Sequence, residues 1–251
     1  EELVRLRGGE HVSDQTTGRV AVVTGASSGI GAAVARQLAS EGWAVALAAR
    51  TESRLRAVAD AIQDNGHSSL AVPTDVTDAA QVAALFDAVD SAYGRVDALI
   101  NSAGMSTGGE IADTDVDAWW DTMDVNVRGT YLCSRAALRC MLPAGDGHVI
   151  NVLSVASETA FAGASAYCAS KAAALMFTKV MAAEVRERGV RVTAILPGAT
   201  DTPLWDDMGF RPAREDMMPT ERVAETISFV LSQPRTAVVD QVQVMPPRGI
   251  L

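Results

Sequence analysis

Tyr167 and Lys171 form a pair of side chains whose spacing suits proton transfer. Residues four positions apart lie one turn apart on the same face of a helix. An ammonium group in that position favours the phenolate and therefore lowers the pKa of the tyrosine. Such a phenol can supply the proton that an alkoxide needs once a nicotinamide has delivered hydride to a carbonyl. We therefore expect Tyr167 to act as acid and base, and Lys171 to lower its pKa.

A second stretch with chemical potential is VAVVTGASSGIGAAVA, residues 20–35, in which an apolar run leads into a glycine-rich turn. Gly25, Gly29 and Gly31 follow the spacing G-x-x-x-G-x-G between an expected strand and an expected helix. The N-terminus of a helix in that position can bind the pyrophosphate of a dinucleotide. The pattern favours a dinucleotide site over a glycine-rich turn that binds nothing.

The same turn also fits the spacing G-x-S-x-G, with Ser27 at the position of the nucleophile in an α/β-hydrolase. That chemistry requires a histidine late in the chain. The histidines that follow the turn are His67 and His148, and neither lies in the last third of the sequence. Hydrolysis is therefore the weaker interpretation of this turn.

The elements that must position these residues alternate between short apolar runs and longer helical patterns, which predicts a doubly wound parallel sheet. Strands are expected at residues 20–24, 44–49, 69–72, 96–100, 148–153, 190–196 and 238–244. Helices are expected at 30–40, 52–64, 79–93, 115–142, 165–188 and 220–232. The prediction is an α/β fold, a single Rossmann-like domain over residues 19–251 with about seven strands and helices on both faces. Residues 1–18 fall outside the periodic pattern and are interpreted as an N-terminal extension.

Composition narrows the function classes. The formal net charge is −10, with 21 basic against 31 acidic residues, which argues against a nucleic-acid partner. No apolar run approaches the roughly 18 residues that span a membrane. The three cysteines, at 133, 140 and 168, show no paired metal spacing, so the sequence predicts reduced thiols, no metal and a cytoplasmic location.

Six short motifs occur in order along the chain: TGASSGIG at 24–31, NSAG at 101–104, DVNVRG at 124–129, INVLS at 150–154, YCASK at 167–171 and PGATDT at 197–202. Together they resemble the short-chain dehydrogenase/reductase family throughout residues 19–246. The stretch RVAETISFVLSQPRTAVVDQVQVMP further resembles the branch of that family that acts on short hydroxy acids and related alcohols.

The resemblance implies an oxidoreductase that interconverts an alcohol and a carbonyl. It gives Tyr167 and Lys171 the roles derived above, Ser154 the role of orienting the substrate oxygen, and Asn126 a water that links Lys171 to solvent in a proton relay. Taken singly, each of these residues could be structural. The catalytic interpretation depends on all four occurring together beside the glycine turn.

The resemblance and the spacing also predict the residues that bind the cofactor. The set is Gly25, Ser27, Ser28, Gly29, Ile30, Gly31, Arg50, Thr51, Asp75, Val76, Asn101, Ala103, Gly104, Tyr167, Lys171, Pro197, Gly198, Thr200 and Thr202. Asp75 would bind the adenine amino group. Ser102 and Ser28 depart from the family, which more often has asparagine and, in many NADP-binding members, a second basic residue.

The expected cofactor is NADP(H), favoured over NAD(H). An NAD site places an acid at the end of the second strand, where it binds the ribose 2′-hydroxyl and repels a 2′-phosphate. Here no acid occurs between Gly42 and Arg50, and Arg50 offers a guanidinium that can bind the phosphate.

Substrate selection is expected from residues 105–107, 155–158 and 199–219, the last with Leu204, Trp205, Met208, Phe210, Met217 and Met218 as an apolar lid. Arg211 and Arg214 could pair with a substrate carboxylate. The expected partners are a small carbonyl or alcohol substrate and further copies of the chain, a dimer or tetramer through the long helices. The alternatives are a 3-oxoacyl thioester reductase and a catalytically silent nucleotide sensor.

Overall fold

A computed structural model describes residues 18–208 and 212–249 of the chain as alternating strands and helices. The strands are β1 (Val20–Thr24), β2 (Ala44–Ala49), β3 (Ser69–Pro73), β4 (Ala98–Asn101), β5 (Gly147–Val152), β6 (Val190–Pro197) and β7 (Gln241–Val244). The α-helices are α1 (Gly29–Ser40), α2 (Glu52–Asp64), α3 (Ala79–Tyr93), α4 (Val116–Met123), α5 (Thr130–Ala144), α6 (Ser165–Val185) and α7 (Thr220–Ser232). Residues 1–17 of the expected extension lie outside the described part.

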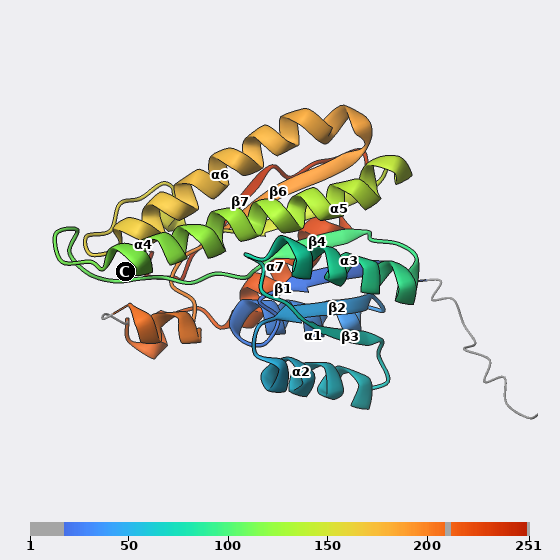
Figure 1. Cartoon of the computed structure of the whole chain (residues 1–251), viewed down its shortest axis with the longest axis horizontal. Coiled ribbons are helices and arrows are strands. Elements are labelled where there is room, and N and C mark those ends of the chain that lie inside the picture. The colour runs from blue at the N-terminus through green and yellow to red at the C-terminus, as the bar shows by residue number, and fades with distance from the viewer. Residues whose placement is uncertain (1–17, 209–211, 250–251) are drawn as a thin grey trace, which may run out of the picture.

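All seven strands form one parallel sheet in the order β3-β2-β1-β4-β5-β6-β7 (Figure 1). The chain builds outward from β1 in one direction and then, starting at β4, in the other. Ligands of such sheets bind beyond the carboxyl ends of the strands, at the point where the order reverses. The glycine-rich turn after β1 and the NSAG loop after β4 meet at this point. The expected fold class is confirmed.

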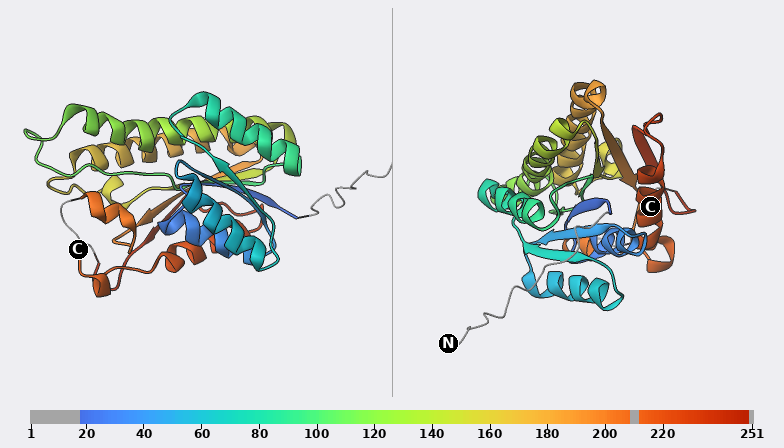
Figure 2. Two further views of the ribbon diagram at one scale, coloured as in Figure 1. Left: turned by 60° about the horizontal axis from the view of Figure 1, so that its bottom comes forward. Right: turned by 90° about the vertical axis from the view of Figure 1, so that its right-hand side faces the viewer.

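Helices cover both faces of the sheet (Figure 2). Apolar side chains of α1, α2 and α7 pack on one face, and those of α3, α5 and α6 pack on the other. Strand β1 is fully buried, and its residues contribute alternately to the two cores, as expected for a central parallel strand. No helix in the described ranges is long and apolar enough to cross a membrane.

The helix expected at 115–142 is divided into α4, a π-helical turn at Asp124–Gly129 and α5. The turn coincides with the motif DVNVRG, which interrupts the helical pattern of the sequence. A β-carbon on Gly129 would lie 2.6 Å from Cγ2 of Val76, so glycine allows the helix to approach the loop after β3. Turns of this kind are frequent at functional sites.

Two predicted elements are shorter than expected. Helix α6 ends at Val185 and continues as a 3₁₀ turn at Arg186–Arg188. Strand β7 starts at Gln241 rather than at residue 238. The carbonyl of Val239, before this strand, accepts a hydrogen bond from the Thr193 side chain at 2.6 Å.

Helix α6 is attached to the centre of the sheet by a buried polar network. Asn151 of β5 donates through Nδ2 to Oγ1 of Thr178, 2.8 Å away, and Asn101 of β4 donates to Oδ1 of Asn151 at the same distance. Because buried amides are costly to leave unpaired, these contacts fix the position of α6 relative to β5. Tyr167 and Lys171 lie on this helix.

We predict that Thr178→Val lowers the free energy of unfolding by about 1–3 kcal/mol, because Nδ2 of buried Asn151 loses its acceptor. Thr226→Val is the matched control. Thr226 of α7 also donates to the carbonyl four residues earlier, but this hydrogen bond is exposed and lies outside the buried network. Its substitution should cost less than about 0.5 kcal/mol. Equal effects in denaturant titration would contradict the proposed role of the network.

Candidate active site

The glycine-rich turn lies directly against the NSAG loop. A β-carbon on Gly25, whose φ is +67°, would be 2.6 Å from the carbonyl oxygen of Ser102. One on Gly31 would be 2.4 Å from the carbonyl oxygen of Gly25, where α1 starts. Oγ1 of Thr24 accepts hydrogen bonds from the amides of Ser102 and Ala103, both at 3.1 Å. The backbone at the switch point is thus packed so closely that glycine is required.

A cleft runs from this turn along the carboxyl edge of the sheet. Most of the predicted cofactor residues line it, namely Gly25, Ser27, Ser28, Gly29, Ile30, Gly31, Arg50, Thr51, Asp75, Val76, Ala103, Gly104, Tyr167, Lys171 and Thr202. The residues come from the segments after five different strands, β1, β2, β3, β4 and β6, and from α6. The family resemblance and the motif spacing therefore identified a set of residues that the fold brings together.

Four predicted residues do not line the cleft. The side chain of Asn101 is buried in the polar network with Ser134 and Asn151, so its amide points into the core. Pro197, Gly198 and Thr200 line a neighbouring cavity instead. A sequence motif predicts that a residue lies near the site, but it does not predict the direction in which the side chain points.

Arg54 is a lining residue that sequence reasoning missed. It lies on α2 beside Arg50, and its Nη2 donates to Oγ1 of Thr51 at 3.0 Å. Its position in the sequence could have indicated this, because Arg54 lies four residues after Arg50, at the start of the second helix. Among the residues that the structure describes, the end of the cleft at β2 therefore carries two guanidinium groups, and the one acid that lines the cleft is Asp75, from the loop after β3.

The cleft fits a dinucleotide. Its glycine turn leaves open the space that a β-carbon would fill, and the amino end of α1 points its free backbone amides toward that space. The hydroxyl of Ser28, the residue that precedes α1, makes no capping bond to the helix. Ser28 and the turn would hold a pyrophosphate, and Arg50, Thr51 and Arg54 would face the ribose at the end of β2.

Tyr167 and Lys171 are both buried, with exposed fractions of 8% and 6%. They lie on the same face of α6, as their spacing predicts, with Nζ of Lys171 5.6 Å from the centre of the Tyr167 ring. Nζ also donates a hydrogen bond of 3.1 Å to the carbonyl of Val152, the last residue of β5. The lysine is therefore held between the tyrosine and the end of a central strand.

The predicted lowering of the tyrosine pKa is wrong for the protein without ligand. Burial raises the pKa of Tyr167 to about 12, and the Ser154 hydroxyl only partly opposes this. Burial also lowers the pKa of Lys171 to about 8. Both shifts have one cause, because a site closed to water disfavours the charged form of each group. The phenol is consequently neutral and protonated near neutral pH.

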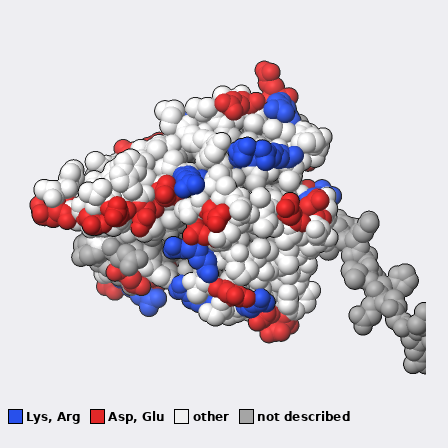
Figure 3. Space-filling view, viewed as in Figure 1, with Lys and Arg blue, Asp and Glu red and all other residues white. Residues whose placement is uncertain are grey.

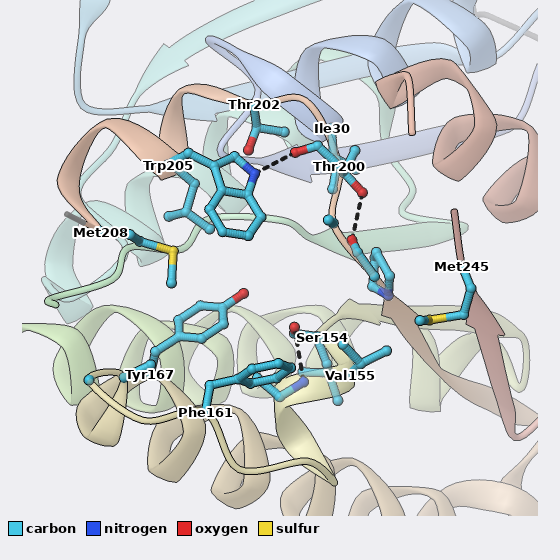
Figure 4. A pocket seen from close by; sticks show the side chains of 18 of the residues that line it. Ile30, Ser154, Val155, Phe161, Tyr167, Thr200, Thr202, Trp205, Met208 and Met245 are labelled. Atoms are coloured by element: carbon cyan, nitrogen blue, oxygen red, sulfur yellow. Dashed lines mark hydrogen bonds between the residues drawn. The ribbon is translucent and has the colours of Figure 1, made fainter. Parts of the chain in front are cut away.

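Ser154 follows β5 and begins a 3₁₀ turn at Val155–Ser157. Its Oγ accepts a hydrogen bond of 3.1 Å from the amide of Ala156, which leaves the hydroxyl proton available to a ligand. Figure 4 shows the hydroxyls of Ser154 and Tyr167 directed toward the same space. Two hydroxyls placed in this way can bind a single carbonyl or alcohol oxygen.

Asn126, in the π-helical turn, holds the backbone of Met105 through both ends of its amide. Its Oδ1 accepts from the Met105 amide at 3.0 Å, and its Nδ2 donates to the Met105 carbonyl at 2.9 Å and to Oγ of Ser170 at 2.9 Å. Ser170 is adjacent to Lys171 in α6. The side chain thus positions the loop after β4 against the helix that carries the lysine.

An apolar cavity of about 260 Å³ adjoins the cleft, and Tyr167 lines both (Figure 4). Phe161, Leu204, Trp205, Met208 and Met245 contribute large side chains to its wall. Of the expected lid residues, Met217 and Met218 are buried outside this wall, and Phe210 lies outside the described residues.

The geometry does not support the hydrolase interpretation of the turn. Ser27 follows the carboxyl end of β1, whereas His148 lies at the opposite edge, near the start of β5. His148 is buried, which lowers its pKa to about 3, and its Nε2 bonds to Oγ1 of Thr193 at 2.8 Å. His67 precedes β3 and thus also lies at the opposite edge.

Comparison with solved structures shows the same fold in proteins with nicotinamide cofactors. An alcohol dehydrogenase from the archaeon Thermococcus sibiricus, complexed with 5-hydroxy-NADP, has a TM-score of 0.85 and 27% identity over 91% of this chain and 97% of that one. A metagenomic short-chain oxidoreductase in complex with NADP has a TM-score of 0.81 and 33% identity over 93% and 99%. A variant of actinorhodin polyketide ketoreductase with NADPH has a TM-score of 0.85 and 29% identity over 92% and 97%.

The sequence itself matches the family described as short chain dehydrogenase over residues 19–210. An uncharacterized oxidoreductase from Staphylococcus saprophyticus is 41% identical over 229 residues, which cover 91% of this chain and 97% of that relative. An uncharacterized oxidoreductase from Staphylococcus aureus is 37% identical over 230 residues, covering 92% and 98%. The chain therefore belongs to the short-chain dehydrogenase/reductase family of oxidoreductases.

Proposed function

We propose that this protein is an NADP(H)-dependent oxidoreductase that interconverts an alcohol and a carbonyl, with Tyr167 as acid and base. The observation that carries the proposal is the place of Tyr167 and Lys171. They are buried at the junction between a dinucleotide-sized cleft and an apolar cavity, with Ser154 facing the same space. A proton donor between a cofactor site and a substrate site is the arrangement that carbonyl reduction requires.

In the proposed mechanism, bound NADPH supplies the hydride. Ser154 donates a hydrogen bond to the substrate oxygen and so directs it toward the Tyr167 hydroxyl. Tyr167, neutral because it is buried, gives its proton to that oxygen as negative charge develops there. The ammonium of Lys171, held by the Val152 carbonyl, stabilises the phenolate that remains.

Asn126 has a positioning role in this proposal. It fixes the Met105 backbone and, through Ser170, the turn of α6 that carries Lys171. A β-carbon on Gly104 would lie 3.4 Å from Oδ1 of Asn126 and 3.6 Å from Nζ of Lys171, so both groups border one point beside the NSAG loop. A water at that point would complete the proton relay implied by the family resemblance.

The preference for NADP(H) rests on charge at the end of β2. Arg50 and Arg54 line the cleft there, and α2 offers no acid that would repel a 2′-phosphate from inside it. The three solved neighbours described above were complexed with NADP, NADPH or a derivative. Arg54 supplies the second basic group that the glycine turn lacks at Ser28.

A 3-oxoacyl thioester is the alternative substrate, since one solved neighbour is a polyketide ketoreductase. A silent nucleotide sensor fits less well, because such a protein would have no need of a buried lysine beside a buried tyrosine.

We further propose a cytoplasmic homo-oligomer, a dimer or tetramer. Its support is the outer surface of α5 and α6, where Tyr131, Met176 and Val180 are 46%, 61% and 48% exposed.

Tyr167→Phe should reduce kcat for carbonyl reduction by at least about 100-fold, because the ring still packs but the proton donor is gone. NADPH affinity, measured by fluorescence titration, should stay within about threefold of the parent. Tyr93→Phe is the control, because this substitution also removes one phenolic hydroxyl, but Tyr93 lines neither the cleft nor the cavity. Turnover by the Tyr167 variant within a few-fold of the parent would refute the mechanism.

Arg50→Ala should lower kcat/KM for NADPH by about ten- to a hundredfold and leave kcat/KM for NADH nearly unchanged, because only the phosphate contact is lost. Arg54→Ala should act in the same direction with a smaller effect. Arg56→Ala is the matched control, because Arg56 lies on the same helix, pairs with Glu52 and does not line the cleft. A parent that prefers NADH, or two variants that both keep the NADPH preference, would overturn the assignment.

A further inference from the structure

The cavity beside Tyr167 carries more information about the substrate than the sequence does. Resting on the proposed function, we infer that the substrate is an uncharged ketone, or the matching secondary alcohol, with one aromatic or alicyclic ring beside the reacting carbon. Trp205 is the specificity-determining residue that recognises this ring. The inference departs from the hydroxy-acid substrate that the C-terminal resemblance implied.

The wall of the cavity is mostly apolar. Ser154 and Tyr167 direct their hydroxyls toward the same space, and the hydroxyl of Thr200 is already bonded to the carbonyl of Gly198 at 3.0 Å. Besides these and Thr202, the side chains are aliphatic, aromatic or thioether groups. A carbonyl oxygen bound by the hydroxyls of Ser154 and Tyr167 leaves the rest of the substrate against apolar surface.

Trp205 and Phe161 enter the cavity from opposite sides, with the Tyr167 hydroxyl directed toward the space between them (Figure 4). The indole is fixed, because its Nε1 donates a hydrogen bond of 2.8 Å to the carbonyl of Thr200. A fixed aromatic ring costs little conformational entropy on binding and favours a second ring or an apolar ring system.

The size of the cavity indicates how large a part of the substrate it can enclose. Its volume is about 260 Å³. An apolar cavity of about 150 Å³ binds benzene. The space beside Tyr167 therefore accepts one ring with a short chain. Met245 closes one side, because the segment after β7 packs so tightly on Gly198 that a β-carbon there would lie 2.9 Å from Sδ of Met245.

No lysine or arginine lines this cavity in the part of the chain that the structure describes. Arg214, expected to bind a carboxylate, pairs instead with Asp201 at 2.6 Å and is 77% exposed at its side chain. Arg248 pairs with Asp216 at 2.8 Å. Arg211 lies outside the described residues. A carboxylate in the cavity would lose its water without gaining a cation from the described lining residues, which is strongly unfavourable.

The surface near the cavity is acidic as well. Exposed carboxylates occur at positions 110, 113, 115, 117, 121 and 124, and Figure 3 shows acidic side chains along the end of the molecule that carries α4. The amide of Gly109 donates a 2.9 Å hydrogen bond to the carbonyl of Gly163, which lines the cavity. This acidic segment therefore lies next to the cavity wall and repels anionic substrates.

The test compares three ketones with NADPH in steady-state assays. para-Methylacetophenone and para-acetylbenzoate carry a methyl or a carboxylate group at the same ring position, and butanone lacks the ring. We expect kcat/KM for para-methylacetophenone to exceed that for the other two by at least about tenfold. A preference for para-acetylbenzoate or for butanone would overturn the inference.

Trp205→Ala should lower kcat/KM for para-methylacetophenone by about tenfold, mainly through KM, and affect butanone less. Trp205→Phe keeps an aromatic ring and should retain kcat/KM for para-methylacetophenone within about threefold of the parent. This second variant tests the role of the ring even where the alanine variant folds poorly. Trp120→Ala is the control, since Trp120 is exposed on α4 and lines neither the cleft nor the cavity. Equal losses for both ketones in Trp205→Ala would refute the role of Trp205.

The two proposals fail in different ways. If the protein reduces para-acetylbenzoate best and Tyr167→Phe abolishes that activity, the inference about the substrate is wrong and the proposed function stands. If NADPH is oxidised with none of these ketones, nor with a 3-oxoacyl thioester, both are wrong.

Discussion

The site depends on one costly interaction, the burial of the Lys171 ammonium at the end of β5. Its Nζ donates to the carbonyl of Val152, and the lysine lies beneath Tyr167 on the same helix. Burial removes water from the ammonium and so disfavours its charged form, which lowers the pKa of Lys171 to about 8. A buried charge is costly unless polar groups are held in place around it. The Asn151–Thr178 contact and the Asn126–Ser170 contact both serve to hold α6 in place around this residue.

The topology explains why these groups meet. In a parallel sheet every strand delivers its following loop to the same edge, so the glycine turn, the NSAG loop and Ser154 converge although they are far apart in sequence. Close backbone approach at Gly25 and Gly31 then shapes the cleft for a dinucleotide. The apolar cavity is lined mainly by later segments, with Leu204, Trp205, Met208 and Met245 near Tyr167.

The sequence predicted the strands, most helix bounds and most of the residues that line the cleft, because apolar periodicity and motif spacing are local signals. It failed where the outcome depends on three-dimensional packing. Asn101 turns into the core because Ser134 and Asn151 offer partners there, and Arg54 reaches the cleft because α2 starts beside it. The pKa of Tyr167 rises because burial outweighs the hydrogen bond with Ser154, and sequence spacing carries no information about burial.

The central claim is that burial keeps Tyr167 protonated, so that it can give its proton to the substrate oxygen. NMR titration of protein labelled at the tyrosine ζ-carbon tests it directly, with Tyr167→Phe identifying the resonance. In the free protein we expect the pKa of Tyr167 to be raised to about 12. Saturating NADP⁺ should lower this pKa, because a positively charged nicotinamide bound in the cleft that Tyr167 lines would favour the phenolate. A Tyr167 pKa near that of an exposed tyrosine in the free protein, or one that NADP⁺ does not change, would contradict the account.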